Sequence, residues 1–174
     1  MEKADLFIVQ LGALLHDIAD WKFNNGDFEI GPKIAREFLE KLKVEENVIL
    51  KVCDIIRNIS FKGAGVKSQI KTLEGKIVQD ADRLDALGAM GISRIFAYGG
   101  VVGREIHNPN IKPKLHKTFK QYKNQKSTSI NHFYEKILLL KDLMNTKTGK
   151  KMANQRHKFI ENYLKQFYKE WEGK

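Results

Sequence analysis

Residues 11–20 read Leu11-Gly12-Ala13-Leu14-Leu15-His16-Asp17-Ile18-Ala19-Asp20. An imidazole and a carboxylate stand side by side here, at the end of a nearly all-apolar segment. Burying a charge beside Leu14, Leu15 and Ile18 costs free energy unless a partner or a metal ion compensates it. The pair therefore indicates a functional site. A second acidic cluster could complete that site: Gln79-Asp80-Ala81-Asp82-Arg83-Leu84-Asp85.

The spacing of apolar residues predicts an all-α protein. We expect a buried helix over about 4–21, because apolar residues occur nearly all round it. A second helix begins at Gly31-Pro32, where the missing N–H of proline is harmless. A third helix is predicted over about 45–59, and a fourth begins near residue 73 and runs through the acidic cluster. After a bend at Gly88 and Gly91, a helix continues up to Gly99-Gly100. Two last helices are predicted over about 130–144 and 148–171. Residues 101–126 show weak periodicity and are predicted to form a long loop or lid.

The composition is that of a globular protein that works inside a cell. The 174 residues are 42% hydrophobic and 30% charged, which predicts a single domain over 1–174 with a proper core. Cys53 is the only cysteine, so neither a disulfide framework nor a cysteine-based zinc site is expected. The first residues do not form a basic signal segment, and the apolar stretch 6–15 is too short to span a bilayer. We expect a cytoplasmic protein without membrane association.

The net charge of +10 is unevenly distributed along the chain. Residues 1–111 carry 15 basic and 16 acidic residues, a net of −1, whereas residues 112–174 carry 16 and 5, a net of +11. Such a surface attracts phosphates and polyanions, although a solvated lysine-rich face is the simpler interpretation. No helix-turn-helix or similar reading motif is present. A basic nucleic-acid-binding module is therefore the last of three functional hypotheses, and nucleic acid is not an expected partner.

The two polar clusters together have the donor chemistry of a metal site. His16 and Asp17 offer a nitrogen and an oxygen ligand, and Asp82 or Asp80 would add an oxygen from a distant helix. One imidazole with two carboxylates suits Mn²⁺, Mg²⁺ or Fe²⁺, and Zn²⁺ less well. Asp20 lies one helical turn beyond His16, where it could orient the imidazole or handle protons. A lone histidine on an apolar helix is more often a core residue, which remains the alternative.

The order of these motifs resembles the HD-domain superfamily of metal-dependent phosphohydrolases, in particular its small bacterial and archaeal members. The similarity covers nearly the whole chain, begins with the run Leu14–Phe23 and is strongest over Thr72–Ala89. It continues through Ile59–Gly63, Tyr98-Gly99-Gly100, Gly103-Arg104, His132-Phe133 and Glu135-Lys136. The resemblance implies an all-α HD-domain helical bundle over residues 1–174.

The same resemblance implies a ligand set and a reaction. The family holds one divalent ion with histidines and aspartates that map onto His16, Asp17 and Asp82, with Asp80 as the alternative to Asp82. Mn²⁺ or Mg²⁺ is the expected ion, with Fe²⁺, Ni²⁺, Co²⁺ and Zn²⁺ as alternatives. A metal-activated water would cleave a small phosphorylated substrate, expected to be a nucleotide. Asp17 and Asp20 are the expected catalytic residues. The expected phosphate-binding residues are Lys22, Lys62, Arg83 and Arg104.

The chain departs from the family pattern in one respect. The family's first ligand is a histidine upstream of the His-Asp pair, and none of the fifteen residues before His16 is a histidine. We expect either that an N-terminal helix is lost or left out, or that the protein is naturally short. An incomplete site motivates the second hypothesis, a truncated or degenerate HD scaffold that binds a nucleotide or a partner without catalysis. Apolar surface left uncovered would favour self-association as a homo-oligomer.

Overall fold

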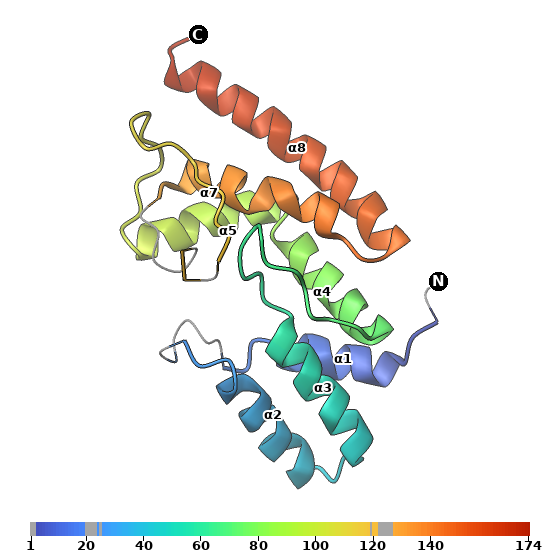
Figure 1. The fold of residues 1–174 in the computed structure, drawn as a ribbon. Helices are drawn as coiled ribbons and strands as arrows, with labels where there is room; N and C mark the ends of the chain where they lie inside the picture. Colours follow the sequence, from blue (N-terminus) through green and yellow to red (C-terminus); the bar gives the residue numbers. More distant parts are fainter. Residues whose placement is uncertain (1–2, 20–23, 25, 119, 122–126) are drawn as a thin grey trace. The chain divides into compact units, whose positions relative to one another are not determined.

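The computed structural model describes residues 3–19, 24, 26–118, 120–121 and 127–174. Every regular element within these ranges is a helix, so the predicted all-α class is confirmed (Figure 1). The described chain forms two compact units. The first unit contains the residues up to Phe61 together with Lys67–Ala81, and the second contains Lys62–Val66 and Asp82–Lys174. None of the described helices is both long enough and apolar enough to cross a membrane.

The first unit is built from three helices and most of a fourth. These are α1 (Leu6–Leu15), α2 (Ile30–Lys41), α3 (Glu46–Asn58) and α4 (Leu73–Asp85), of which the last four residues belong to the second unit. Gly12 brings α1 close to its neighbours, because a Cβ added there would lie 3.3 Å from side-chain atoms of Ile55 and of Val78. The core consists of Ile8, Leu15, Ala35, Leu39, Ile49, Val52, Cys53, Ile55, Ile56, Ile59 and Val78.

Helix α1 is shorter and more exposed than its sequence predicts. Asp5 caps its N-terminus by accepting from the backbone N–H groups of Phe7 and Ile8, and the helix ends at Leu15 instead of near residue 21. Residues 16–19 form turns, and 20–23 lie outside the described ranges. Leu14 is 79% exposed, so the prediction of a helix buried all round was wrong. A uniformly apolar helix does not encode which face its neighbours cover, and here they cover only one side. Self-association through the exposed side stays a prediction.

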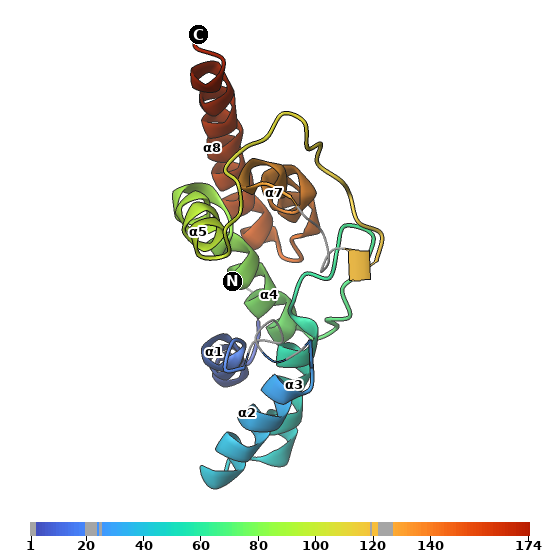
Figure 2. The same cartoon turned by 90° about the vertical axis from the view of Figure 1, so that its left-hand side faces the viewer.

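The second unit packs three helices and a 3₁₀ segment after the end of α4. These are α5 (Gly88–Val101), α7 (Ser129–Glu135), η2 (Ile137–Leu143) and α8 (Lys147–Trp171), seen from another side in Figure 2. Gly88 has φ +74°, a conformation that favours glycine, and it allows the turn between α4 and α5. The core here includes Ile92, Ile95, Ile130, Phe133, Ile137, Leu140, Met144, Ala153, Ile160 and Leu164.

The single helix predicted over 130–144 is two elements in the structure. Lys136, with φ −140° and ψ −58°, interrupts the α-helix after α7, and a 3₁₀ helix follows. The side chains at positions i and i+3 align in a 3₁₀ helix, and this alignment places Ile137 and Leu140 together in the core. The prediction was therefore wrong about continuity, because an apolar spacing of three fits both kinds of helix over so short a run.

Hydrogen bonds between described residues attach the segment after α5 to α7. The backbone N–H groups of Ser129 and Ile130 donate to the carbonyl oxygens of Glu105 (2.9 Å) and Ile106 (3.0 Å). Asn131 Nδ2 donates to the Ile111 carbonyl at 2.7 Å, and the Lys114 N–H donates to Glu135 Oε1 at 3.1 Å. Residues 105–118, named here the strap, contain no regular helix, whereas Val101 ends α5 and residues 120–121 are helical. A lid function for 101–126 stays a prediction.

Candidate metal and phosphate site

His16 follows α1 directly, and its ring is oriented by the end of that helix. Its Nδ1 lies 2.8 Å from the carbonyl oxygen of Ala13, three residues earlier. A carbonyl oxygen only accepts, so the contact requires that Nδ1 carries the hydrogen and donates it. In the neutral ring, Nε2 then has the lone pair that a metal ion needs. The end of α1 therefore orients the ring of His16, with Nδ1 toward the Ala13 carbonyl and Nε2 toward Asp17.

His16 and Asp17 form a two-ligand pair. Nε2 of His16 lies 3.2 Å from Oδ2 of Asp17, and the two side chains are 23% and 69% exposed. Two ligands at about 2.1 Å from one cation and at right angles to each other are separated by about 3 Å, so this pair suits adjacent positions on one ion. An imidazole nitrogen and a carboxylate oxygen are also the donors that Mn²⁺ and Mg²⁺ sites use. The residues therefore fit the predicted ion.

Two donors alone would fill only part of the coordination shell of a divalent ion. Within the described ranges, no group of three or more His, Cys, Asp or Glu side chains lies close enough together to hold a metal. His16 and Asp17 belong to the first unit, as does Asp80, whereas Asp82 is the first residue of α4 that belongs to the second unit. The full set of His16, Asp17 and Asp82 therefore stays a prediction.

Asp80 and Asp82 have different surroundings on α4. Their positions differ by about 200° around the helix axis, so they lie on different faces. Asp80 is buried, with 3% exposure, and Asp82 is half-buried. Val78 lies four residues before Asp82, on the same face of α4, and Val78 is the residue that meets Gly12 of α1. The helical register therefore separates the two candidate ligands.

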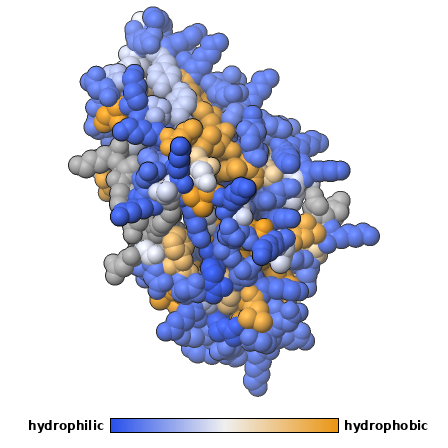
Figure 3. All heavy atoms as spheres, viewed as in Figure 1, coloured by the Kyte–Doolittle hydropathy of each residue, from blue (hydrophilic) through white to orange (hydrophobic). Residues whose placement is uncertain are grey.

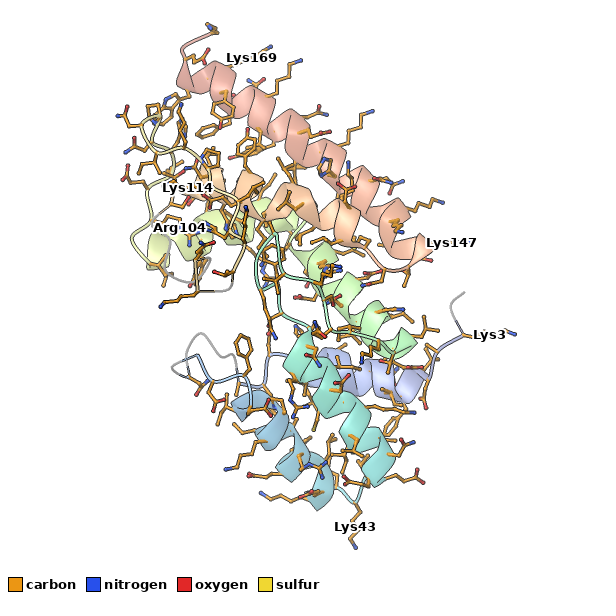
Figure 4. All side chains as sticks on the ribbon, in the orientation of Figure 1. Lys3, Lys43, Arg104, Lys114, Lys147 and Lys169 are labelled. Atoms are coloured by element: carbon orange, nitrogen blue, oxygen red, sulfur yellow. The ribbon has the colours of Figure 1, made fainter. Side chains whose placement is uncertain are left out.

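The predicted phosphate-binding residues fall in several places. Arg83 is buried, and its Nη1 donates to the Leu143 carbonyl at the end of η2, which is a stabilising contact within the fold. The guanidinium carbon of Arg104 lies 5.8 Å from the centre of the Tyr98 ring, close enough for a cation–π contact, and Figure 4 shows where Arg104 lies. Lys62 is half-buried beside Gly63, in a loop next to the end of the strap. Asp20 and Lys22 lie outside the described residues.

One buried acid was not predicted as a site residue. Glu135 is 2% exposed, and its Oε1 accepts from Ser127 Oγ (2.8 Å) and from the Lys114 N–H. Its Oε2 is buried and has no hydrogen-bond partner among the described residues. The signal in the sequence is the pair of polar residues Asn131 and Glu135, which are four positions apart and so lie on one face of the helix. Both side chains hold the strap, which explains why polar groups occur there.

Comparisons with known proteins identify the family. The family model for the HD domain matches residues 1–87. The protein YpgQ of Bacillus subtilis is 35% identical over 173 residues, which cover 99% of this chain and 76% of YpgQ. The chain belongs to the HD-domain superfamily. The resemblance inferred from the His-Asp pair and the later acidic cluster is confirmed.

Solved structures place this HD-domain protein beside hydrolases. An HD-superfamily hydrolase from Bacillus thuringiensis is 45% identical with a TM-score of 0.72, covering 99% of this chain and 77% of that one. A protein from Lactobacillus plantarum is 38% identical with a TM-score of 0.81, covering 98% and 79%. YpgQ in complex with ADP is 31% identical with a TM-score of 0.70, covering 96% and 78%. The HD-type helical fold is thus confirmed, within a family of metal-dependent phosphohydrolases.

Proposed function

We propose that this HD-domain protein is a metal-dependent phosphohydrolase that cleaves phosphate esters or anhydrides of nucleotides. One observation carries the proposal: His16 Nε2 and Asp17 Oδ2 lie 3.2 Å apart, while Nδ1 is held by the Ala13 carbonyl. This arrangement presents two metal donors side by side. Membership of a family of hydrolases supports the reaction class.

The proposed ligands are His16, Asp17 and Asp82. A bound Mn²⁺ or Mg²⁺ ion would polarise a phosphoryl oxygen and lower the pKa of a water. The register of α4 places Asp82 and Asp80 on different faces, and Asp82 is the less buried of the two. Burial of Asp80 favours Asp82, since a ligand must reach an ion that also meets substrate.

The other proposed residues orient groups or neutralise charge. Asp20, four residues after His16 in the sequence, would accept or deliver a proton near the substrate. Lys22, Lys62 and Arg104 would bind phosphate oxygens, and stacking on Tyr98 would restrict the Arg104 guanidinium to a narrow set of orientations. Arg83 would act mainly by holding the end of η2.

A nucleotide is the proposed substrate because of one relative. The structure of YpgQ that contains ADP covers 96% of this chain at 31% identity. A diphosphate on a nucleoside would bring both negative charge and a phosphoanhydride bond to the basic residues named above. Comparing ATP, ADP and p-nitrophenyl phosphate as substrates tests whether the nucleoside part is needed, with products separated by ion-exchange chromatography.

The hydrolase proposal is tested with matched variants in the presence of Mn²⁺. We expect wild type to release phosphate or pyrophosphate from at least one nucleotide, and Asp17→Asn to lower kcat/KM by about 100-fold or more through loss of a ligand. Glu37→Gln, a charge-neutralising change at an exposed position of α2, should leave the rate unchanged. Wild-type activity in Asp17→Asn, or the absence of turnover with every substrate, would reject the proposal.

A nucleotide-binding protein without catalysis is the second candidate. The observation that favours it is the absence of a third metal donor beside His16 and Asp17 within the described part of the chain. Isothermal titration separates the two candidates. Binding of ADP without hydrolysis of any nucleotide, in a preparation that also fails to bind Mn²⁺, would support the scaffold. Mn²⁺ binding together with turnover would support the hydrolase.

A further inference from the structure

Helix α8 carries a row of lysines that the proposed hydrolase site does not use. Lys147, Lys151, Lys158, Lys165 and Lys169 follow one another at spacings of four and seven residues, which return to the same face of an α-helix. All five are exposed. We call these five residues the lysine ridge. At 1.5 Å per residue the ridge extends for about 33 Å, and Figure 4 labels its two ends, Lys147 and Lys169.

The positive charge of the ridge is not neutralised within the protein. None of its five lysines forms an ion pair in the described chain. Helix α8 carries two acids, Glu161 and Glu170, and Oε1 of Glu161 lies 3.3 Å from Nε2 of His157. Glu170 accepts from Gln166 Nε2 at 2.7 Å. In Figure 3, hydrophilic side chains line the outer edge of α8, from its C-terminal end at the top toward the right.

We infer that the lysine ridge binds the phosphate backbone of nucleic acid without reading its sequence. Duplex DNA carries one phosphate charge per 1.7 Å of its axis, so about 20 charges lie along 33 Å of duplex, and those on the near side would face the ridge. Lysines bind phosphates as point charges. Each neutralised phosphate releases counterions from the nucleic acid, and this release drives association. No base-reading element accompanies the ridge, so affinity without specificity is expected.

Two other classes of partner fit the ridge less well. An anionic membrane binds amphipathic helices through an apolar face, but the apolar face of α8, with Ala153, Ile160 and Leu164, is buried in the second unit. Protein interfaces are depleted in lysine and need apolar or aromatic anchors at their centre. The ridge has asparagines, Asn154 and Asn162, between its lysines instead. A phosphodiester backbone needs only the charge and the spacing.

The inference is tested by fluorescence anisotropy with a labelled 20-base-pair duplex of arbitrary sequence. The ridge variant combines Lys151→Gln, Lys158→Gln, Lys165→Gln and Lys169→Gln, since glutamine keeps helix propensity close to that of lysine. The control variant makes the same charge change on exposed residues of the first unit: Lys33→Gln, Lys41→Gln, Lys67→Gln and Lys71→Gln. Circular dichroism melts establish that both variants are folded. If the fourfold ridge variant is not folded, the double variant Lys158→Gln, Lys165→Gln replaces it in the binding measurement.

We expect wild type to bind the duplex at about 50 mM salt with an affinity that falls steeply as salt rises. The ridge variant should bind at least about tenfold more weakly and lose about 3 to 4 from the slope of log K against log salt, while the control stays near wild type. Unchanged nucleotide hydrolysis in the ridge variant would show that the ridge acts apart from the proposed catalytic site. The assignment would be overturned if both variants lost affinity for the duplex equally, or if wild type did not bind the duplex. It would also be overturned if wild type bound only inorganic polyphosphate or phosphatidylserine vesicles.

Discussion

The ring of His16 donates from Nδ1 to the carbonyl oxygen of Ala13 over 2.8 Å. This single contact links the end of helix α1 to the chemistry of the site, because it leaves Nε2 as the nitrogen beside Asp17. The Ala13 carbonyl is accessible to the ring because α1 ends at Leu15. A helix that continued through residue 17 would offer this carbonyl to a backbone N–H instead.

The tautomer of His16 can be observed directly by NMR. We expect the long-range ¹H–¹⁵N spectrum of the metal-free protein to show a protonated Nδ1, because the Ala13 carbonyl can only accept. A diamagnetic divalent ion such as Zn²⁺ should then shift the Nε2 resonance and leave Nδ1 protonated. The opposite tautomer in the free protein would contradict the role assigned to Ala13.

The buried Glu135 gives a test that separates charge from shape. Glu135→Gln keeps an oxygen that can accept from Ser127 and Lys114, and it replaces the buried Oε2 that has no hydrogen-bond partner. We expect this variant to lose less stability than Glu135→Ala, because it keeps the acceptor for Ser127 and Lys114 while its NH₂ group brings two buried N–H donors in place of Oε2. Glu135→Ala leaves both donors without their acceptor and should cost about 1–3 kcal/mol in urea unfolding. If the glutamine variant is as unstable as the alanine variant, the charge itself is needed.

The one-sided packing of α1 predicts a large loss of stability at one of its apolar residues and a small loss at another. Ile8 is 1% exposed in the core of the first unit, so Ile8→Ala should lower the free energy of unfolding by about 2–5 kcal/mol. Leu14, on the exposed side, should cost less than about 0.5 kcal/mol when replaced by alanine. Similar losses for the two variants in chemical denaturation would show that another surface covers Leu14.

Cys53 provides a probe for opening of the first unit. Its thiol donates to the Pro32 carbonyl at 3.3 Å, and burial raises the pKa of the thiol. The native protein should therefore react slowly with a disulfide reagent at pH 8, because little thiolate forms and access is blocked. Unfolding should return the thiol to its ordinary pKa and make the reaction fast.

The pH dependence of stability follows from the same shift. Because the folded state holds the Cys53 proton more tightly than the unfolded state, this group contributes stability below the ordinary thiol pKa and loses it as the pH rises through the raised value. Cys53→Ala should remove that alkaline loss. Fast labelling of the folded protein, with a rate that does not depend on denaturant, would contradict the buried placement.

The sequence predicted much of the fold because several helices have one clear apolar stripe. The helices expected over 45–59 and 148–171 match α3 and α8 within about two residues. In both helices the buried apolar residues repeat at helical spacing: Ile49, Val52 and Ile56 on α3, and Ile160 and Leu164 on α8. The pattern failed where it was ambiguous. Uniform apolarity hid the exposed side of α1, and the three-residue spacing of Ile137 and Leu140 hid the 3₁₀ helix.

The site was predictable from the sequence only in part. The unusual position of His16-Asp17 on an apolar segment identified the pair. The orientation of the His16 ring could not be predicted, because it depends on where α1 ends. Glu135 was missed because its burial depends on the strap, which is fixed to α7 by contacts between distant parts of the chain.

The central claim, that His16 and Asp17 are adjacent ligands of one divalent ion, is tested most directly by anomalous scattering. Crystals grown with MnCl₂ would be measured at the manganese absorption edge. We expect an anomalous peak within about 2.2 Å of both His16 Nε2 and an Asp17 carboxylate oxygen, and its absence in crystals of Asp17→Asn. An anomalous map with no peak at this pair, from crystals whose manganese content is established, would contradict the claim.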